Sequence, residues 1–295
     1  MTPSLYYNTV TPLLREILDK LMRAPELSLF RLVGGTSLSL RLGHRESVDI
    51  DMFTGQDYGT IDWRAIYELL RREFAYADNR IQEDGLHSFG ESFYLGESEF
   101  KRVKVDLFYT DPFLQPAEQI DGIRMAALED IVAMKVDVVL RGGRKKDFWD
   151  LHELKQNYTI GQMLDLHRQR YPWTHERETI IRNFTSFQLA DEDFDPNCLR
   201  GKYWEFIKMD FVNWLGQFTR NYTQTVKRAA DNKRRYAPGE GSIPPVLLSG
   251  VSKGVPPLAH DFACKVECVI PAGVADGGNG VRCFLRPVCS VRKTG

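Results

Sequence analysis

The sequence predicts an α+β fold, with a small mixed sheet and its helices first and a helical unit after it. Strand-like segments are confined to the first 110 residues, whereas from Arg124 onward apolar residues recur at helical spacing. A length of 295 residues suits one large domain or two modest ones. We therefore expect an α/β domain at residues 1–123, a helical domain at 124–236 and a separate tail at 237–295.

Composition sets limits on the class of protein. Hydrophobic residues make up 43% of the chain and charged residues 27%, which is ordinary for a globular protein with a core. The formal net charge is −1, so no global basic field indicates nucleic acid binding, although a local patch is compatible with it. No apolar run is long enough to span a membrane, and the N-terminus lacks a signal-peptide core. We expect a cytoplasmic protein.

The first domain is predicted to alternate between helices and short strands. Glycines follow the first strand, Thr36 is placed as an N-cap, and Gly43 closes the next helix as a C-cap. Material typical of a β-hairpin fills residues 80–110. In chain order, the other expected elements are a helix at 10–24, a strand at 28–35, a helix at 36–43, a strand at 47–53 and a helix at 62–74.

Three carboxylates share strand faces in this domain. Asp49 and Asp51 are two positions apart in "SVDIDMF", so they point to the same side of their strand. Asp106 lies in "FKRVKVDLFY", where it shares a face with Lys104 and Phe108 opposite the apolar residues. If the two strands pair, the three carboxylates converge, and such a set binds hard divalent cations, usually Mg²⁺. Two such ions about 4 Å apart can clamp a phosphoryl displacement.

Two glycines precede these aspartates. Gly34 and Gly35 lie between a strand and the start of a helix, where backbone N–H groups and the helix dipole favour a phosphate. On their own the glycines are most simply a turn. Followed by an Asp-x-Asp strand, they supply the phosphate half of a nucleoside triphosphate site whose aspartates supply the metal half.

The second half of the chain is helical up to the tail. We expect helices at 124–142 and 145–156, with further helices through 199–235. The tail is rich in Pro, Gly and Val and holds four of the five cysteines of the chain. Its lack of periodicity predicts a disordered appendage outside the functional fold.

The motifs "LVGGTSLSLRLGHRESVDIDMF" and "EDIVAMKVDVVLRGGRKKDFWDLHEL" together resemble the AbiEii/AbiGii toxin family. These are nucleotidyltransferase-like toxins of type IV toxin–antitoxin and abortive-infection systems, in the nucleotidyltransferase β-like superfamily. The resemblance covers roughly residues 10–235. It implies a nucleotidyltransferase-like first domain whose active site is completed by the helical domain.

The resemblance also implies roles for particular residues. Asp49 and Asp51 would bind Mg²⁺ and act in catalysis, with Lys135 and Asp147 completing the catalytic set. Asp106 falls where the wider superfamily has a third metal-binding carboxylate, on which this branch does not always rely. The triphosphate-binding residues implied are Gly34, Gly35, Thr36, Ser37 and Arg45.

Each of these residues also has a simpler explanation. Asp106 is compatible with an exposed edge strand, Lys135 with a lysine that reaches to solvent from an apolar helix, and Asp147 with a helix N-cap. The run "RGGRKK" is either a solvated charged face or a basic lip for RNA.

The function implied is Mg²⁺-dependent transfer of an NMP from an NTP to an acceptor hydroxyl, by a toxin with a repressor-type antitoxin partner. RNA, tRNA in particular, is the acceptor implied by analogy. Three alternatives stay open at this point. They are a non-catalytic nucleotide- or RNA-binding module, a nucleotidyltransferase acting on a small molecule, and a metal-dependent glycosyltransferase that uses Asp-x-Asp with a nucleotide sugar.

Overall fold

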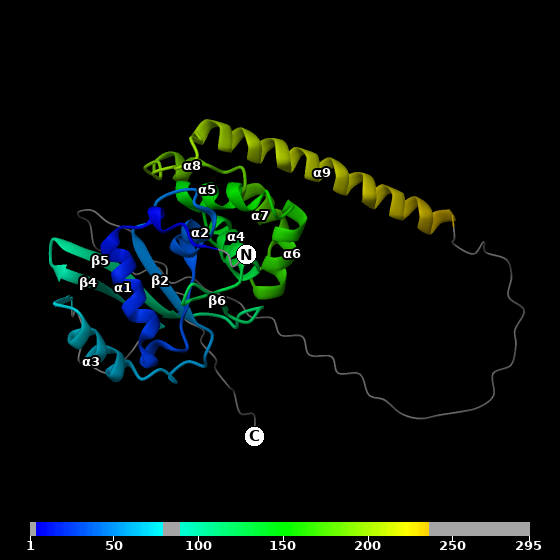
Figure 1. The fold of residues 1–295 in the computed structure, drawn as a ribbon. Helices are drawn as coiled ribbons and strands as arrows, with labels where there is room; N and C mark the ends of the chain where they lie inside the picture. Colours follow the sequence, from blue (N-terminus) through cyan, green and yellow to red (C-terminus); the bar gives the residue numbers. More distant parts are fainter. Residues whose placement is uncertain (1–3, 79–88, 236–295) are drawn as a thin grey trace, which may run out of the picture. The chain divides into compact units, whose positions relative to one another are not determined.

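A computed structural model describes residues 4–78 and 89–235 (Figure 1). Over these residues the chain forms one seven-stranded sheet in the order β3-β4-β5-β2-β1-β7-β6. The predicted α+β class is confirmed, because the strands of this sheet end by Met125 and the described elements after it are helices. The strands are β1 (Arg31–Leu32), β2 (Asp49–Thr54), β3 (Tyr76–Ala77), β4 (Gly90–Ser98), β5 (Lys101–Tyr109), β6 (Glu118–Ile120) and β7 (Ile123–Met125).

The sheet is mixed, as the sequence predicts. β2 pairs in parallel with β5, and β1 pairs in parallel with β7, whereas all other neighbours are antiparallel. The hairpin of β4 and β5 was expected from the sequence, and its partner β2 brings the Asp-x-Asp motif beside it. In this register Asp51 lies opposite Asp106, and Asp49 lies opposite Lys104.

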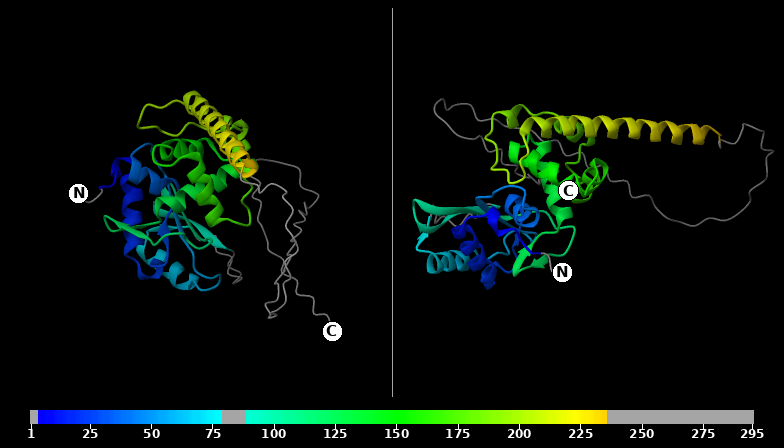
Figure 2. Two further views of the ribbon diagram at one scale, coloured as in Figure 1. Left: turned by 90° about the vertical axis from the view of Figure 1, so that its right-hand side faces the viewer. Right: turned by 45° about the horizontal axis from the view of Figure 1, so that its top comes forward.

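Helices cover the two sides of the sheet unequally. Figures 1 and 2 show α1 and α3 on one side, while the helices from α4 onward gather on the other. No described helix combines the length and the apolar character that crossing a membrane requires. The helices are α1 (Pro12–Arg23), α2 (Gly34–Leu42), α3 (Trp63–Glu73), α4 (Leu128–Leu140), α5 (Lys145–Leu154), α6 (Ile160–Arg170), α7 (Arg177–Asn183), α8 (Gln188–Asp191) and α9 (Trp204–Arg235), with 3₁₀ turns η1 (Tyr7–Thr9) and η2 (Pro25–Leu27).

Two hydrophobic clusters form the core. The first lies between the sheet and helices α1 and α3, and includes the alternating Val103, Val105 and Leu107 of β5. The second cluster packs the helices from α4 through α9 against one another. It also includes Val33, which directly precedes α2, and Leu38 of α2. Because α2 contributes to the second cluster while following a strand of the sheet, it connects the sheet to the helical part. The division into domains at residue 123 stays a prediction.

Two local expectations were wrong. Thr36 is not an N-cap, because α2 begins at Gly34 and Val33 is the capping residue. Gly34 has a φ of 68°, a backbone conformation open to glycine, and this lets the helix start two residues early. Helix α4 begins at Leu128 rather than Arg124, since residues 123–125 pair with the sheet as β7.

Gly43 is the expected C-cap, with φ 65°. The tail and residues 79–88 of the predicted hairpin lie outside the described residues.

A buried ion pair fixes the loop after β5 to the helical part. Arg170 of α6 and Asp130 of α4 are both fully buried and lie 2.5 Å apart. Arg170 also donates to the carbonyls of Asp111 and Pro112, and Asp130 accepts the N–H groups of Leu114 and Gln115. The pair therefore satisfies loop backbone groups as well as neutralising its own charges.

We expect Arg170→Met to lower the free energy of unfolding by about 3 kcal/mol, because Asp130 is left charged and buried without its partner. Urea unfolding followed by circular dichroism measures the change. Arg168→Met on the same helix is the matched control, since Arg168 pairs with Asp165 at the exposed surface and contributes under about 1 kcal/mol. Equal losses in the two variants would contradict the prediction.

Candidate active site

The site is built where α2 starts beside the middle of the sheet. β2 presents Asp49 and Asp51 on the face toward α2, and the parallel neighbour β5 presents Asp106 in register with Asp51. The pairing that the three-carboxylate hypothesis requires is therefore present. Asp49 and Asp106 lie close enough to Asp51 to affect its titration. Burial and the Asp106 carboxylate raise the pKa of Asp51 to about 6, against the opposing effect of Lys135.

Gly34 and Gly35 each lie against a charged side chain. A Cβ atom at Gly34 would collide with the carboxylate of Asp51, and one at Gly35 would collide with the guanidinium of Arg45. The backbone at the start of α2 therefore approaches both side chains as closely as only glycine allows. The start of α2 therefore stands next to the carboxylate of Asp51.

Thr36 and Ser37 turn away from this corner into the protein. The Thr36 hydroxyl lies 2.7 Å from the Ser47 hydroxyl and donates to the carbonyl of Asp49, so it fixes the segment that enters β2. Ser37 is fully buried. Neither residue lines the pocket described below, whereas Gly34 and Gly35 do. A triphosphate-binding role for Thr36 and Ser37 stays a prediction.

A buried network of charges lies beneath the site. Asp150 of α5 accepts two hydrogen bonds from Arg45, at 2.7 and 2.9 Å, and one from His44 at 2.8 Å. Its second oxygen also lies 2.7 Å from Nζ of Lys135. Burial would raise the pKa of Asp150, but Arg45 and Lys135 outweigh it and hold that pKa well below its usual range. Arg45 thus binds a protein carboxylate in this structure and lies outside the pocket wall.

Lys135 and Asp147, which the family resemblance implies for the catalytic set, are in direct contact. Nζ of Lys135 lies 2.7 Å from Oδ1 of Asp147, and Oδ2 of Asp147 accepts the backbone N–H of Arg144 at 3.0 Å. Asp147 therefore stabilises the start of α5 and holds Lys135 at the same time. Burial favours the neutral form of Lys135, but Asp147 and Asp150 outweigh it and raise the pKa of that lysine. Lys135 is charged and held within the wall rather than reaching to solvent.

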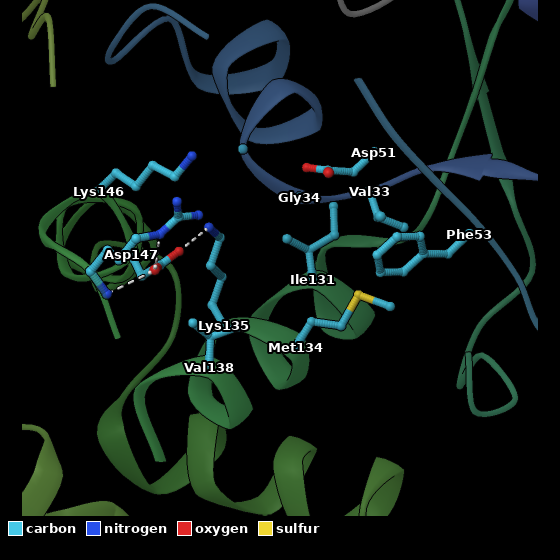
Figure 3. Close-up of a pocket in the computed structure, with 12 residues that line it drawn as sticks. Val33, Gly34, Asp51, Phe53, Ile131, Met134, Lys135, Val138, Lys146 and Asp147 are labelled. Atoms are coloured by element: carbon cyan, nitrogen blue, oxygen red, sulfur yellow. Dashed lines mark hydrogen bonds and ion pairs between the residues drawn. The ribbon is translucent and has the colours of Figure 1, made fainter. Parts of the chain in front are cut away.

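Several of these charged side chains line a pocket of about 170 Å³ between the sheet and the helical part. Figure 3 shows its two sides: Lys135, Lys146 and Asp147 face one end, while Phe53, Ile131 and Met134 face the other. Asp51 and Gly34 lie between the two ends. The pocket is therefore polarised, with a cationic end, an apolar end and the carboxylate in the middle.

Two lysines at the site were not identified from the sequence. Nζ of Lys146 lies 3.8 Å from Oδ2 of Asp49, and burial together with the nearby Arg144 lowers its pKa. Lys104 lies 2.5 Å from Asp106. The signals were present, since Lys146 precedes Asp147 in "RKKD" and Lys104 shares the predicted face of Asp106. The contacts themselves depend on which strands and helices meet, which the local pattern does not specify.

A divalent cation fits the residues at this corner. Oδ1 of Asp106 is buried and accepts no hydrogen bond from the described residues, and burial together with the neighbouring Asp106 carboxylate raises the pKa of Asp51. Over residues 4–78 and 89–235, however, no three His, Cys, Asp or Glu side chains gather into a ready metal-binding group. Metal binding by Asp49, Asp51 and Asp106 accordingly stays a prediction.

A family comparison places this chain in the nucleotidyltransferase class of toxins. The family model described as "Nucleotidyl transferase AbiEii toxin, Type IV TA system" matches residues 16–216, and the chain belongs to this family. The resemblance identified from the two sequence motifs is therefore confirmed.

The individual proteins to which this chain is similar have low sequence identity to it. An uncharacterised protein of Aquifex aeolicus is 28% identical over 218 residues, covering 70% of this chain and 96% of that protein. Among solved structures, nucleotidyltransferase toxin MenT4 of Mycobacterium tuberculosis is similar at 14% identity and a TM-score of 0.47, covering 69% of this chain and 82% of that one. A putative nucleotidyltransferase of H. pylori is similar at 17% identity and a TM-score of 0.44, covering 72% and 94%.

We expect the buried network to give stability its pH dependence. Asp150 has a lowered pKa in the folded protein, so its contribution is complete above about pH 4 and is lost as the pH falls through the folded value. Asp150→Asn removes this contribution. The difference in unfolding free energy between the unmodified protein and this variant, measured by urea unfolding, is therefore largest near pH 6 and shrinks toward pH 2.

Asp165→Asn is the control for this series, since Asp165 forms only an exposed pair with Arg168. Its difference from the unmodified protein is small and changes little over the same pH range. A difference for Asp150→Asn that stays constant between pH 6 and pH 2 would rule out the linkage.

Proposed function

We propose that this protein is a Mg²⁺-dependent enzyme that transfers an NMP from an NTP to an acceptor hydroxyl and releases pyrophosphate. The acceptor oxygen bonds to the α-phosphorus as the bond from that phosphorus to the bridging oxygen of the β-phosphate breaks. The hydroxyl proton passes to solvent. Asp49, Asp51, Lys135 and Asp147 form the catalytic set.

One observation carries this proposal: the start of α2 and the carboxylate of Asp51 share a corner that only Gly34 can accommodate. Phosphates bound by the N–H groups of that helix start would lie directly beside the carboxylates of β2. A triphosphate and a metal-ligand carboxylate in contact are what nucleotidyl transfer needs. A metal-dependent glycosyltransferase would give this glycine-led helix start no such role.

The polarity of the pocket supports one orientation of the nucleotide. Lys135 and Lys146 face the phosphate end. There the ammonium of Lys135 would stabilise the charge that develops on the leaving pyrophosphate, while that of Lys146 would bind the phosphates equally before and during transfer. Phe53, Ile131 and Met134 offer an apolar surface for the base and ribose. A pocket of about 170 Å³ is smaller than the roughly 300–1,000 Å³ of typical ligand sites, so part of the nucleotide extends beyond it toward Asp49.

The metal would be held by the β2 aspartates, with Asp106 as the third candidate. A Mg²⁺ ion there neutralises phosphate charge and orients the α-phosphate. Asp147 is a positioning residue in this scheme. It touches Lys135 at 2.7 Å and fixes the direction of that ammonium group, while its other oxygen anchors α5.

The biological role follows from the family. Membership of a type IV toxin–antitoxin family implies an antitoxin partner, which we propose to be of the transcriptional-repressor type. We propose RNA, tRNA in particular, as the acceptor, and the cytoplasm as the location. Arg144 supports a polyanionic acceptor, because it lines the pocket and its side chain is 64% exposed.

We expect purified protein with Mg²⁺, total cellular RNA and each α-³²P-labelled NTP in turn to transfer label to RNA. Asp49→Asn and Asp51→Asn should each reduce the rate by at least about 100-fold, because the charge that holds the metal is lost. Asp57→Asn, an exposed aspartate in the loop after β2, is the control and leaves the rate unchanged.

The other outcomes separate the competing functions. Label on a small molecule rather than RNA would keep the reaction and change the acceptor. Binding of NTPs without any transfer would favour a non-catalytic module, and turnover only with nucleotide sugars and Mn²⁺ would favour a glycosyltransferase.

We expect Lys146→Met to raise the KM for the NTP about tenfold, which corresponds to about 1.4 kcal/mol, with little change in kcat. The reason is the loss of an ammonium that faces the phosphates before and during transfer. Steady-state kinetics measures both constants. Lys145→Met is the matched control, because the neighbouring Lys145 is paired with Asp195 and does not line the pocket. A similar rise in both variants would point to a disturbed α5 instead.

A further inference from the structure

Lys104 occupies an unusual position among the carboxylates. It lies on the same face of β5 as Asp106, two residues away, and is opposite Asp49 in the register of β2 and β5. Its ammonium nitrogen contacts Oδ2 of Asp106 at 2.5 Å. Side chains at Asp49, Asp51, Lys104 and Asp106 therefore form a two-by-two arrangement on one sheet face, with three negative charges and one positive charge.

The pair of Lys104 and Asp106 lies on the outer side of the site. Asp51 lines the pocket, whereas Asp106 and Lys104 lie one strand further away from it. A cation that contacts bound phosphates must therefore lie near Asp49 and Asp51. A second cation, in a site with two divalent ions about 4 Å apart, would lie toward Asp106. The ammonium of Lys104 is already directed to that carboxylate.

The contact between Lys104 and Asp106 differs from an ordinary surface salt bridge. The side chains of Lys104 and Asp106 are only 28% and 18% exposed, so neither group is freely solvated. Oδ1 of Asp106 is buried and accepts no hydrogen bond from the described residues. A pair that served stability alone would satisfy both oxygens. Because one oxygen is left unsatisfied, the pair is better explained by a role in the charge balance of the neighbouring site than by stability alone.

We propose that Lys104 takes the place of the second divalent ion, so that the site binds a single Mg²⁺ through Asp49 and Asp51. This inference rests on the proposed nucleotidyl transfer. One Mg²⁺ and one ammonium together neutralise the three carboxylates, and a compact ammonium matches a metal position better than a planar guanidinium does. Asp106 then orients Lys104 and is not itself required to be a metal ligand.

The test counts bound Mn²⁺, which replaces Mg²⁺ and is paramagnetic. The full chain is dialysed to equilibrium with Mn²⁺ and each of the four α,β-methylene NTP analogues in turn, and ions and nucleotides per chain are counted. We expect one Mn²⁺ per chain in the unmodified protein. In Lys104→Met we expect two, with the spin-coupled electron paramagnetic resonance spectrum of a close ion pair.

Two further variants make the result specific. Lys104→Arg keeps a cation at Asp106, so its count stays at one. Lys101→Met removes another lysine of β5, one that pairs with Glu97 at the exposed hairpin end, and its count also stays at one. A purely structural lysine at position 104 would alter the unfolding free energy and leave the ion count unchanged.

The outcomes distinguish a failure of the proposed role of Lys104 from a failure of the proposed nucleotidyl transfer. Two ions in the unmodified protein, or one ion in a folded Lys104→Met, would overturn the role of Lys104 while label transfer to RNA still stood. If Lys104→Met does not fold, Lys104→Gln, which also removes the charge and keeps a polar side chain, is counted in its place, and two ions are expected. Nucleotide bound without any Mn²⁺ would reject the metal-dependent function, and the inference with it.

Discussion

A single buried carboxylate, Asp150, determines where the rest of the site lies. It is the shared acceptor for Arg45 and His44, which precede β2, and for Lys135 on α4. A buried charge is stable only when it is paired and hydrogen-bonded, so these contacts have to form together. The network therefore sets the spacing between the sheet, which supplies the metal-type carboxylates, and α5, which supplies Asp147 and Lys146.

The glycine pair serves both halves of this arrangement. Gly34 lies against Asp51, and Gly35 lies against Arg45. A methyl group at the first position would displace the carboxylate, and one at the second would displace the guanidinium from Asp150. Two consecutive glycines are thus needed for packing alone, and the proposed approach of a phosphate to the same backbone would add a second requirement. The packing and phosphate-binding interpretations of "GG" support each other.

The parts of the fold that depend on local periodicity were predictable. Alternation assigned Asp49, Asp51 and Asp106 to their faces, and helical spacing identified α1, α3 and α5. The pairing partner of β2 was not predictable, because a parallel neighbour over fifty residues away is chosen by the whole sheet. Thr36 was misassigned since a positive φ at Gly34 is invisible in the sequence. Strand β7 has only three residues, so the helical pattern that follows obscured it.

The sequence analysis did not assign Lys104 and Lys146 to the site, so its account of the charges there was incomplete. Lys146 lies near Asp49 of β2 and lines the pocket, whereas Lys104 contacts Asp106 on the neighbouring strand β5. Without nucleotide, each ammonium compensates a carboxylate that would otherwise repel its neighbours. A triphosphate entering with a cation would compete with Asp49 for Lys146, whereas Lys104 does not line the pocket and would keep Asp106. The site thus has one cation free to change partner and one that is fixed, and only a structure that pairs β2 with β5 distinguishes them.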